Sequence, residues 1–115
     1  MIKWSSLDKV SAVHDLVEQS HKTPCLIFKH STRCSISSMA KLRLESAWDF
    51  SSEEMEPYFL DLIANRDVSN FVAEHFEVYH ESPQVLLVRN GTCTYDASHL
   101  DISVAELHEC YESKF

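Results

Sequence analysis

A cysteine and a serine three residues apart are the side chains in this sequence most suited to chemistry. Cys34 and Ser37 lie in the stretch Phe28-Lys29-His30-Ser31-Thr32-Arg33-Cys34-Ser35-Ile36-Ser37. An apolar run leads into this stretch and a helical pattern leads out of it, so Cys34 is expected where a strand ends and a helix begins. The free N–H groups and the positive dipole end of a helix favour an anion. Because the thiolate is the nucleophilic form of cysteine, we predict that Cys34 is a nucleophile.

Three basic side chains close to Cys34 in the sequence are expected to favour its thiolate: Lys29, His30 and Arg33. The alternative is an inert, buried cysteine. Ser37 stands where a dithiol site would carry its second cysteine. A hydroxyl can donate a hydrogen bond to a thiolate but cannot form a disulfide, so we predict monothiol exchange. Ser37 could instead only assist the start of the helix, and the two roles are compatible.

The other three cysteines are not expected to take part. Cys25 lies in an apolar strand, Cys110 lies on the inner face of the last predicted helix, and Cys93 lies beside a turn. We expect the first two to be core residues and the third to be partly exposed. The four cysteines lack the paired C-x-x-C spacing of a zinc site, and the seven histidines are scattered, so no metal site is predicted.

The elements that must position Cys34 follow from hydrophobic periodicity and turn residues. The sequence predicts helices over about 6–20, 35–48, 68–76 and from 103 onward, and strands over 25–29, 58–63, 84–89 and 92–96. Ser5 or Ser6 is expected to cap the first helix, a Ser103/Glu106 capping box opens the last, and Asn90-Gly91 predicts a hairpin. The second helix is expected to present an apolar row that includes Ile36, Met39, Ala40 and Leu44.

The predicted order, α-β-α-β-α-β-β-α, is that of the thioredoxin-like α/β fold. We expect one domain over residues 1–115, with a central four-stranded mixed sheet flanked by helices. A strand, a helix and a strand of this length favour two parallel strands. Two later segments, 81–83 and 96–102, should then converge on the carboxyl end of the first central strand, where Cys34 stands. The place of Pro83 before a strand at this end favours a cis peptide bond.

Composition limits the classes of partner. The chain has 115 residues and a formal net charge of −8. It has no run of lysine and arginine, so we expect no nucleic-acid binding. It has no apolar stretch of about 18 residues, so we expect no membrane span. Its start lacks the apolar core of a signal peptide, which makes the cytoplasm, where cysteines are reduced, the expected location.

Four stretches together resemble the monothiol bacilliredoxin family: residues 28–37, 69–74, 80–85 and 97–99. The resemblance implies a thioredoxin fold and removal of bacillithiol from protein mixed disulfides by Cys34. It implies bacillithiol as a thiol co-substrate without a tightly bound cofactor, and bacillithiolated proteins as partners. The family's usual motif, T-C-P-I-S, has proline where this chain has Ser35.

The resemblance also implies which residues surround the bound thiol. Ser82 and Pro83 match the segment that holds the cis-proline of the fold, whose preceding backbone pairs with a disulfide substrate. We expect the substrate-binding residues to be Thr32, Arg33, Ser37, Ser82, Pro83, Ser98 and His99. Arg33 and the helix N–H groups suit the carboxylates of such a thiol.

Two other functions stay open from the sequence. The segment Cys34-Ser35-Ile36-Ser37 is also similar to the C-G-F-S site of monothiol glutaredoxins, which can hold an iron–sulfur cluster between two chains. A thioredoxin-like binding module without turnover is the third possibility.

Overall fold

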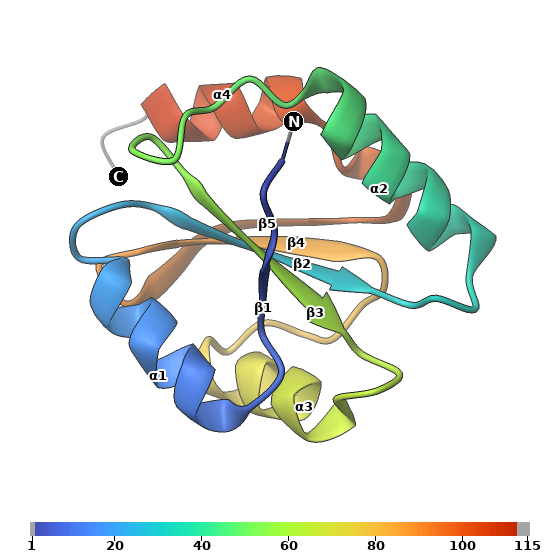
Figure 1. The fold of residues 1–115 in the computed structure, drawn as a ribbon, viewed down its shortest axis with the longest axis horizontal. Helices are drawn as coiled ribbons and strands as arrows, with labels where there is room; N and C mark the ends of the chain where they lie inside the picture. Colours follow the sequence, from blue (N-terminus) through green and yellow to red (C-terminus); the bar gives the residue numbers. More distant parts are fainter. Residues whose placement is uncertain (1, 113–115) are drawn as a thin grey trace.

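A mixed β-sheet forms the centre of the protein in this computed structural model, which describes residues 2–112. The described strands are β1 (Ser5–Ser6), β2 (Cys25–His30), β3 (Glu56–Asp61), β4 (Gln84–Arg89) and β5 (Thr92–Ser98). Their order across the sheet is β1-β3-β2-β4-β5 (Figure 1). β2 pairs in parallel with β3 and antiparallel with β4, as the sequence predicted. The predicted count of four strands is wrong because β1 adds a short fifth strand at the edge.

Helices cover both faces of the sheet. They are α1 (Val10–Gln19), α2 (Ser35–Ala47), α3 (Arg66–His75) and α4 (Val104–Glu112), with a short 3-10 helix, η1 (His99–Asp101), after β5. α2 and α4 lie on one face, and α1 and α3 on the other (Figure 1). The predicted element order is confirmed, with β1 and η1 as additions.

The first helix begins later than the sequence predicted. Ser5 and Ser6 are not helix caps but pair with Tyr58 and Phe59 of β3. The N–H of Leu7 then donates to the carbonyl of Phe59 over 2.9 Å, and α1 begins at Val10. At the sheet edge the backbone groups of Ser5 and Ser6 pair with β3, whereas the first N–H groups of a helix have no backbone partner. The spacing of apolar residues along the sequence does not predict this pairing.

Side chains of β2 alternate between two buried cores, as those of a strand covered on both faces must. Leu26 and Phe28 pack with α2 and α4, whereas Cys25 and Ile27 pack with α1 and α3. By the same alternation Lys29 lies on the α3 side. Every residue of β2 is buried, so the strand that precedes Cys34 is held on both faces.

The inward face of α2 differs from the predicted one. Ser37, Ala40 and Leu44 are buried, whereas 44% of Ile36 and 59% of Met39 are exposed. The buried row begins at Ser37 because the turn after β2 sets the rotation of the helix. Two apolar side chains therefore reach solvent within five residues of Cys34.

The turn and the last helix follow their local signals. Asn90 and Gly91 both have positive φ, 51° and 77°, which joins β4 to β5 as the predicted hairpin. The N–H of Glu106 donates to Ser103 Oγ over 3.2 Å at the start of α4. β5 extends to Ser98, two residues beyond the prediction, and so brings His99 to the end of the sheet where α2 begins.

Candidate thiol site

Cys34 is the residue that caps the start of α2. β2 ends at His30, a turn follows, and Cys34 keeps an extended backbone (φ −117°, ψ 122°) before the helix begins at Ser35. Its side chain is partly exposed. The backbone N–H groups of Ser37 and Ile36 at the start of α2 lower the pKa of the Cys34 thiol, with a smaller contribution from the Ser37 hydroxyl. The site therefore favours the nucleophilic thiolate.

Ser37 supports both the thiol and the turn before it. The residue is fully buried, and its Oγ accepts a hydrogen bond from the N–H of Ser31 over 3.3 Å. Its hydroxyl also contributes to the lowered pKa of the Cys34 thiol. Ser37 therefore fixes the turn that leads into α2, and its position holds no second thiol; its role toward the thiolate stays a prediction.

The three basic neighbours do not act on the thiol in the way the sequence suggested. Lys29 points to the α3 side, where its Nζ donates to Ser69. The His30 ring packs beside the rings of Phe28 and Phe59. None of the three basic groups is a cause of the lowered Cys34 pKa, which comes from the first N–H groups of α2. For Lys29 and His30 the reason is direction: as successive residues of β2 they point to opposite faces of the sheet, Lys29 toward α3 and His30 toward Phe28 and Phe59.

The second half of the site is the segment before β4. Gln84, the first residue of β4, pairs with Lys29 of β2 and with Ser98 of β5, so three strands meet at this end of the sheet. The Ser82–Pro83 peptide bond is cis. The N–H of His99 donates to the carbonyl of Pro83 over 2.9 Å. The two segments expected to converge here are thus joined to each other beside β2.

His99 and its neighbours connect that segment to α2. His99 Nε2 lies 3.4 Å from Glu81 Oε1. On the other side of η1, Arg43 Nη1 of α2 donates to the carbonyl of Leu100 over 3.4 Å. η1 therefore bridges the Pro83 segment and the helix that Cys34 opens, and it leaves 70% of Leu100 exposed.

The predicted substrate-binding residues fall into two groups at this end of the sheet. Thr32 and Arg33 lie exposed in the turn before Cys34. The second group lies in the Pro83 and η1 segments: Ser82 and Ser98 are half-buried, Pro83 is buried and His99 is exposed. Their part in binding a thiol stays a prediction, taken up below.

The pKa values of the remaining cysteines are shifted in the opposite direction from that of Cys34. Burial raises the pKa of Cys25 to about 12 and that of Cys93 to about 11, and it also raises the pKa of Cys110. All four cysteines are free. Among them, Cys34 alone has a lowered pKa, which favours its thiolate over those of the other three.

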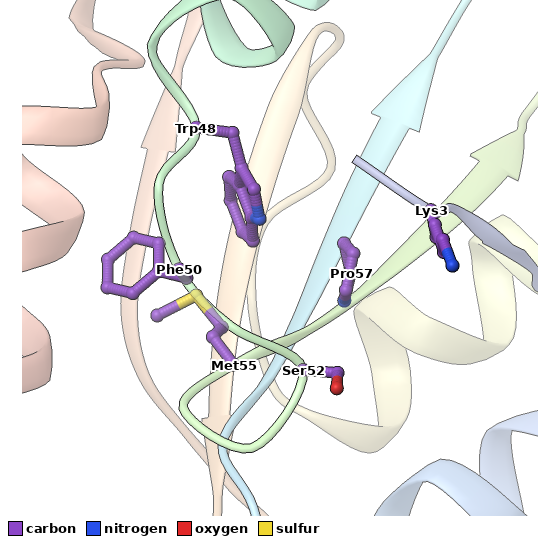
Figure 2. A pocket seen from close by; sticks show the side chains of 6 residues that line it. All are labelled: Lys3, Trp48, Phe50, Ser52, Met55 and Pro57. Atoms are coloured by element: carbon purple, nitrogen blue, oxygen red, sulfur yellow. The ribbon is translucent and has the colours of Figure 1, made fainter. Parts of the chain in front are cut away.

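Two cavities were not anticipated from the sequence. A groove of about 520 Å³ lies beside the start of α2; it is lined by His30, Thr32, Ser38, Lys41, Leu42, Glu45 and Phe59. A second cavity, of about 240 Å³, lies between the segment after α2 and the beginning of β3 (Figure 2). Pro57 lines the second cavity at the amino end of β3, so this cavity is at the end of the sheet away from Cys34.

A buried cluster around Lys29 was also missed. Lys29 is fully buried although it carries an amine, and its Nζ contacts α3 and His80. The one available signal was a lysine at the end of an otherwise apolar strand run. Within residues 2–112, no group of three His, Cys, Asp or Glu side chains is arranged to hold a metal ion. No helix of that range is long and apolar enough to cross a lipid bilayer.

Comparison with known proteins identifies the family. Residues 5–107 match the family described as "Monothiol bacilliredoxin BrxC". A solved structure of a candidate oxidoreductase with a thioredoxin fold is similar at 28% identity and a TM-score of 0.79, over 93% of this chain and 92% of that one.

Two thioredoxins share the fold at lower identity. The thioredoxin of Trypanosoma brucei brucei has a TM-score of 0.77 at 9% identity, over 96% of this chain and 93% of that one. The thioredoxin of Schistosoma mansoni has a TM-score of 0.71 at 15% identity, over 98% and 96%. With the family match over most of its length and the thiol at the start of α2, the chain belongs to the monothiol bacilliredoxin family and is a thiol oxidoreductase with the thioredoxin fold.

Proposed function

We propose that the protein removes bacillithiol from protein mixed disulfides through Cys34. The observation that carries the proposal is a partly exposed thiol whose pKa is lowered by the first N–H groups of α2, with Ser37 in place of a second thiol. Such a site can attack a disulfide but cannot release its product by forming an internal disulfide with residue 37. The family match supports bacillithiol as the small thiol.

The exchange runs in two steps. The Cys34 thiolate attacks the bacillithiol sulfur of a modified protein, a Cys34–bacillithiol disulfide forms, and the target's disulfide bond breaks. The target cysteine leaves as a thiolate and takes a proton from solvent. A second bacillithiol thiolate then attacks the bacillithiol sulfur on Cys34, which releases bacillithiol disulfide and regenerates the Cys34 thiolate. The second thiol supplies the electron pair that the target received.

The bound thiol would lie between the two groups of predicted residues. The exposed Arg33 guanidinium and the positive dipole end of α2 suit its carboxylates. The backbone of Ser82 would pair with the substrate disulfide, and Ser98 and His99 would close the other side. The other predicted contacts are Thr32, Ser37 and Pro83.

The exposed apolar side chains around Cys34 support a protein substrate. Ile36, Met39 and Leu100 are all more than two-fifths exposed, and η1 contacts α2. Exposed apolar side chains on elements that contact one another are a feature of interaction surfaces. We propose bacillithiolated proteins as targets, bacillithiol as a diffusible co-substrate without a bound cofactor, and the reducing cytoplasm as the location.

A purified protein that carries one bacillithiolated cysteine tests the proposal. Mass spectrometry should show loss of bacillithiol from the target and its transient appearance on Cys34. Cys34→Ala should lose at least about a hundredfold in rate, since the nucleophile is absent, whereas Cys93→Ala should react as the wild type does. A Cys34→Ala protein as active as the wild type would refute the proposal. Visible absorbance of an iron–sulfur cluster after anaerobic purification, without exchange activity, would favour a cluster carrier instead.

A further inference from the structure

A lysine is buried on the α3 side of the sheet, under the segment that leads to Pro83. Lys29 has no solvent exposure. Its Nζ donates to the carbonyl of Ser69 in α3 over 3.3 Å and lies 3.2 Å from His80 Nδ1. Because an ammonium has donors only, Nδ1 is the acceptor and the proton of the His80 ring is on Nε2.

Fold stability does not account for this lysine. No carboxylate of residues 2–112 forms an ion pair with it. Burial lowers the pKa of Lys29 to about 8, which shows that the fold disfavours its charged form. An apolar side chain of similar volume would fill the same space without this penalty. Lys29 lies five residues before Cys34, and its burial disfavours the charged amine. We take this combination to indicate that Lys29 has a role in the thiol site.

The contacts of Lys29 and of its neighbour Gln84 show which segment these two side chains hold in place. Gln84 stands opposite Lys29 on β4, is also buried, and donates from Nε2 to the carbonyl of Tyr79 over 3.0 Å. Two polar side chains from adjacent central strands therefore hold residues 79 and 80 from the α3 side. These residues begin the segment that ends at Pro83.

The other end of that segment is held from the opposite direction. His99 donates from its N–H to the carbonyl of Pro83, and its ring lies beside Glu81. The backbone of Ser82 therefore lies between the contacts of residues 79 and 80 on the α3 side and the contact of Pro83 with His99. Loss of the Lys29–His80 contact leaves the other two contacts, so the segment should move without the fold being lost.

We propose that Lys29 is a positioning residue for thiol exchange: its amine holds His80 and thereby sets the backbone of Ser82 against which a mixed disulfide binds. The proposal rests on the function proposed above. Lys29 touches neither substrate nor Cys34 and acts through His80. It predicts that breaking the contact weakens substrate binding while the reactivity of the Cys34 thiol is retained.

Steady-state kinetics with a bacillithiolated peptide, measured over a range of peptide concentrations, tests the inference. His80→Leu and Lys29→Met should each lower kcat/KM about tenfold, mainly through a higher KM, because a displaced contact surface misaligns the substrate. In His80→Asn the amide oxygen stands close to the place of Nδ1 and can accept from Lys29, so its kcat/KM should stay within about twofold of the wild type.

Two controls separate positioning from general damage. Ile27→Val changes a buried residue on the same face of β2 that pairs with Leu86 and has no hydrogen bond to residues 79–83, and it should leave KM unchanged. The rate of Cys34 alkylation by iodoacetamide should be the same in all variants. If Lys29→Met does not fold, the pair at exposed position 80 decides the question alone.

The inference is overturned if His80→Leu keeps the wild-type KM, or if His80→Asn loses as much as His80→Leu. Inactivity of the wild-type protein on every mixed disulfide would instead refute the proposed function. The two failures are therefore told apart by the wild-type rate.

Discussion

Replacement of Lys29 by methionine should change the stability of the protein in a pH-dependent way. Lys29 is fully buried, and burial lowers its pKa from 10.5 to about 8. When folding lowers the pKa of a lysine, the folded state binds fewer protons than the unfolded state at pH values between the folded and the unfolded pKa. Stability conferred by the wild-type residue therefore rises as pH rises from about 8 to about 10.5, and its burial penalty is fully present below pH 8.

The magnitude follows from the size of the shift. A shift of about 2.5 pKa units corresponds to at most about 3 kcal/mol of penalty at pH 7, and to about 1.4 kcal/mol still present at pH 9.5. Methionine removes this penalty but also two hydrogen bonds, each contributing about 1 kcal/mol. We expect Lys29→Met to be about 1 kcal/mol more stable than the wild type near pH 7 and slightly less stable near pH 9.5. The change between the two pH values is about 2 kcal/mol and does not depend on the energy assigned to the hydrogen bonds.

Urea unfolding followed by tryptophan fluorescence measures this difference. Wild-type and variant proteins are compared at several pH values under reducing conditions, with the midpoint and slope fitted at each. Lys22→Met, which removes an exposed lysine after α1, serves as the matched control and should show a pH-independent difference. A difference between Lys29→Met and the wild type that stays flat from about pH 7 to 9.5 would refute the argument that the fold lowers the pKa of Lys29.

Three further outcomes are expected. Native protein treated with iodoacetamide near neutral pH should be alkylated first at Cys34, because burial raises the pKa of Cys25 to about 12 and that of Cys93 to about 11. Peptide mass mapping measures the order of alkylation. Alkylation of Cys25 or Cys93 before Cys34 would contradict the assignment of Cys34 as the reactive thiol. Ser37→Ala should raise the pKa of Cys34, measured from alkylation rates against pH, since a hydroxyl donor is lost; an unchanged midpoint would mean that the backbone N–H groups suffice. Leu107→Ala should lower the free energy of unfolding by about 2–5 kcal/mol in urea, because the side chain is fully buried in the core beneath α4; a loss below about 1 kcal/mol would contradict that packing.

Much of the site was predictable because its signals are local. An apolar strand run followed by helical periodicity placed Cys34 at a strand-to-helix junction, and the helix-start N–H groups that lower its pKa belong to residues within three positions of it. Asn90-Gly91 predicted the hairpin from its own backbone preferences. Strand direction then required the Pro83 segment and residues 98–99 to meet at one end of the sheet, which the structure confirms.

The wrong predictions concern residues whose local sequence allows more than one structure. Contacts with distant parts of the chain then determine which structure forms. Ser5 and Ser6 are acceptable helix caps, but the edge of β3 offers them strand hydrogen bonds instead. Ile36 and Met39 share a helical row with buried residues, but the rotation of α2 against the sheet turns them to solvent. Periodicity reports that a helix has an apolar side without reporting which residues meet the sheet.

The sequence alone therefore placed one thiol at a helix start, with a serine three residues later, because those interactions are made within one turn of chain. Tertiary structure decided that its three basic neighbours do not lower its pKa. Lys29 was expected to assist Cys34, yet alternation along β2 directs it to α3, where it bonds with Ser69 and His80. Its place under the Pro83 segment depends on contacts across 40 and 51 residues, which only the folded chain brings together.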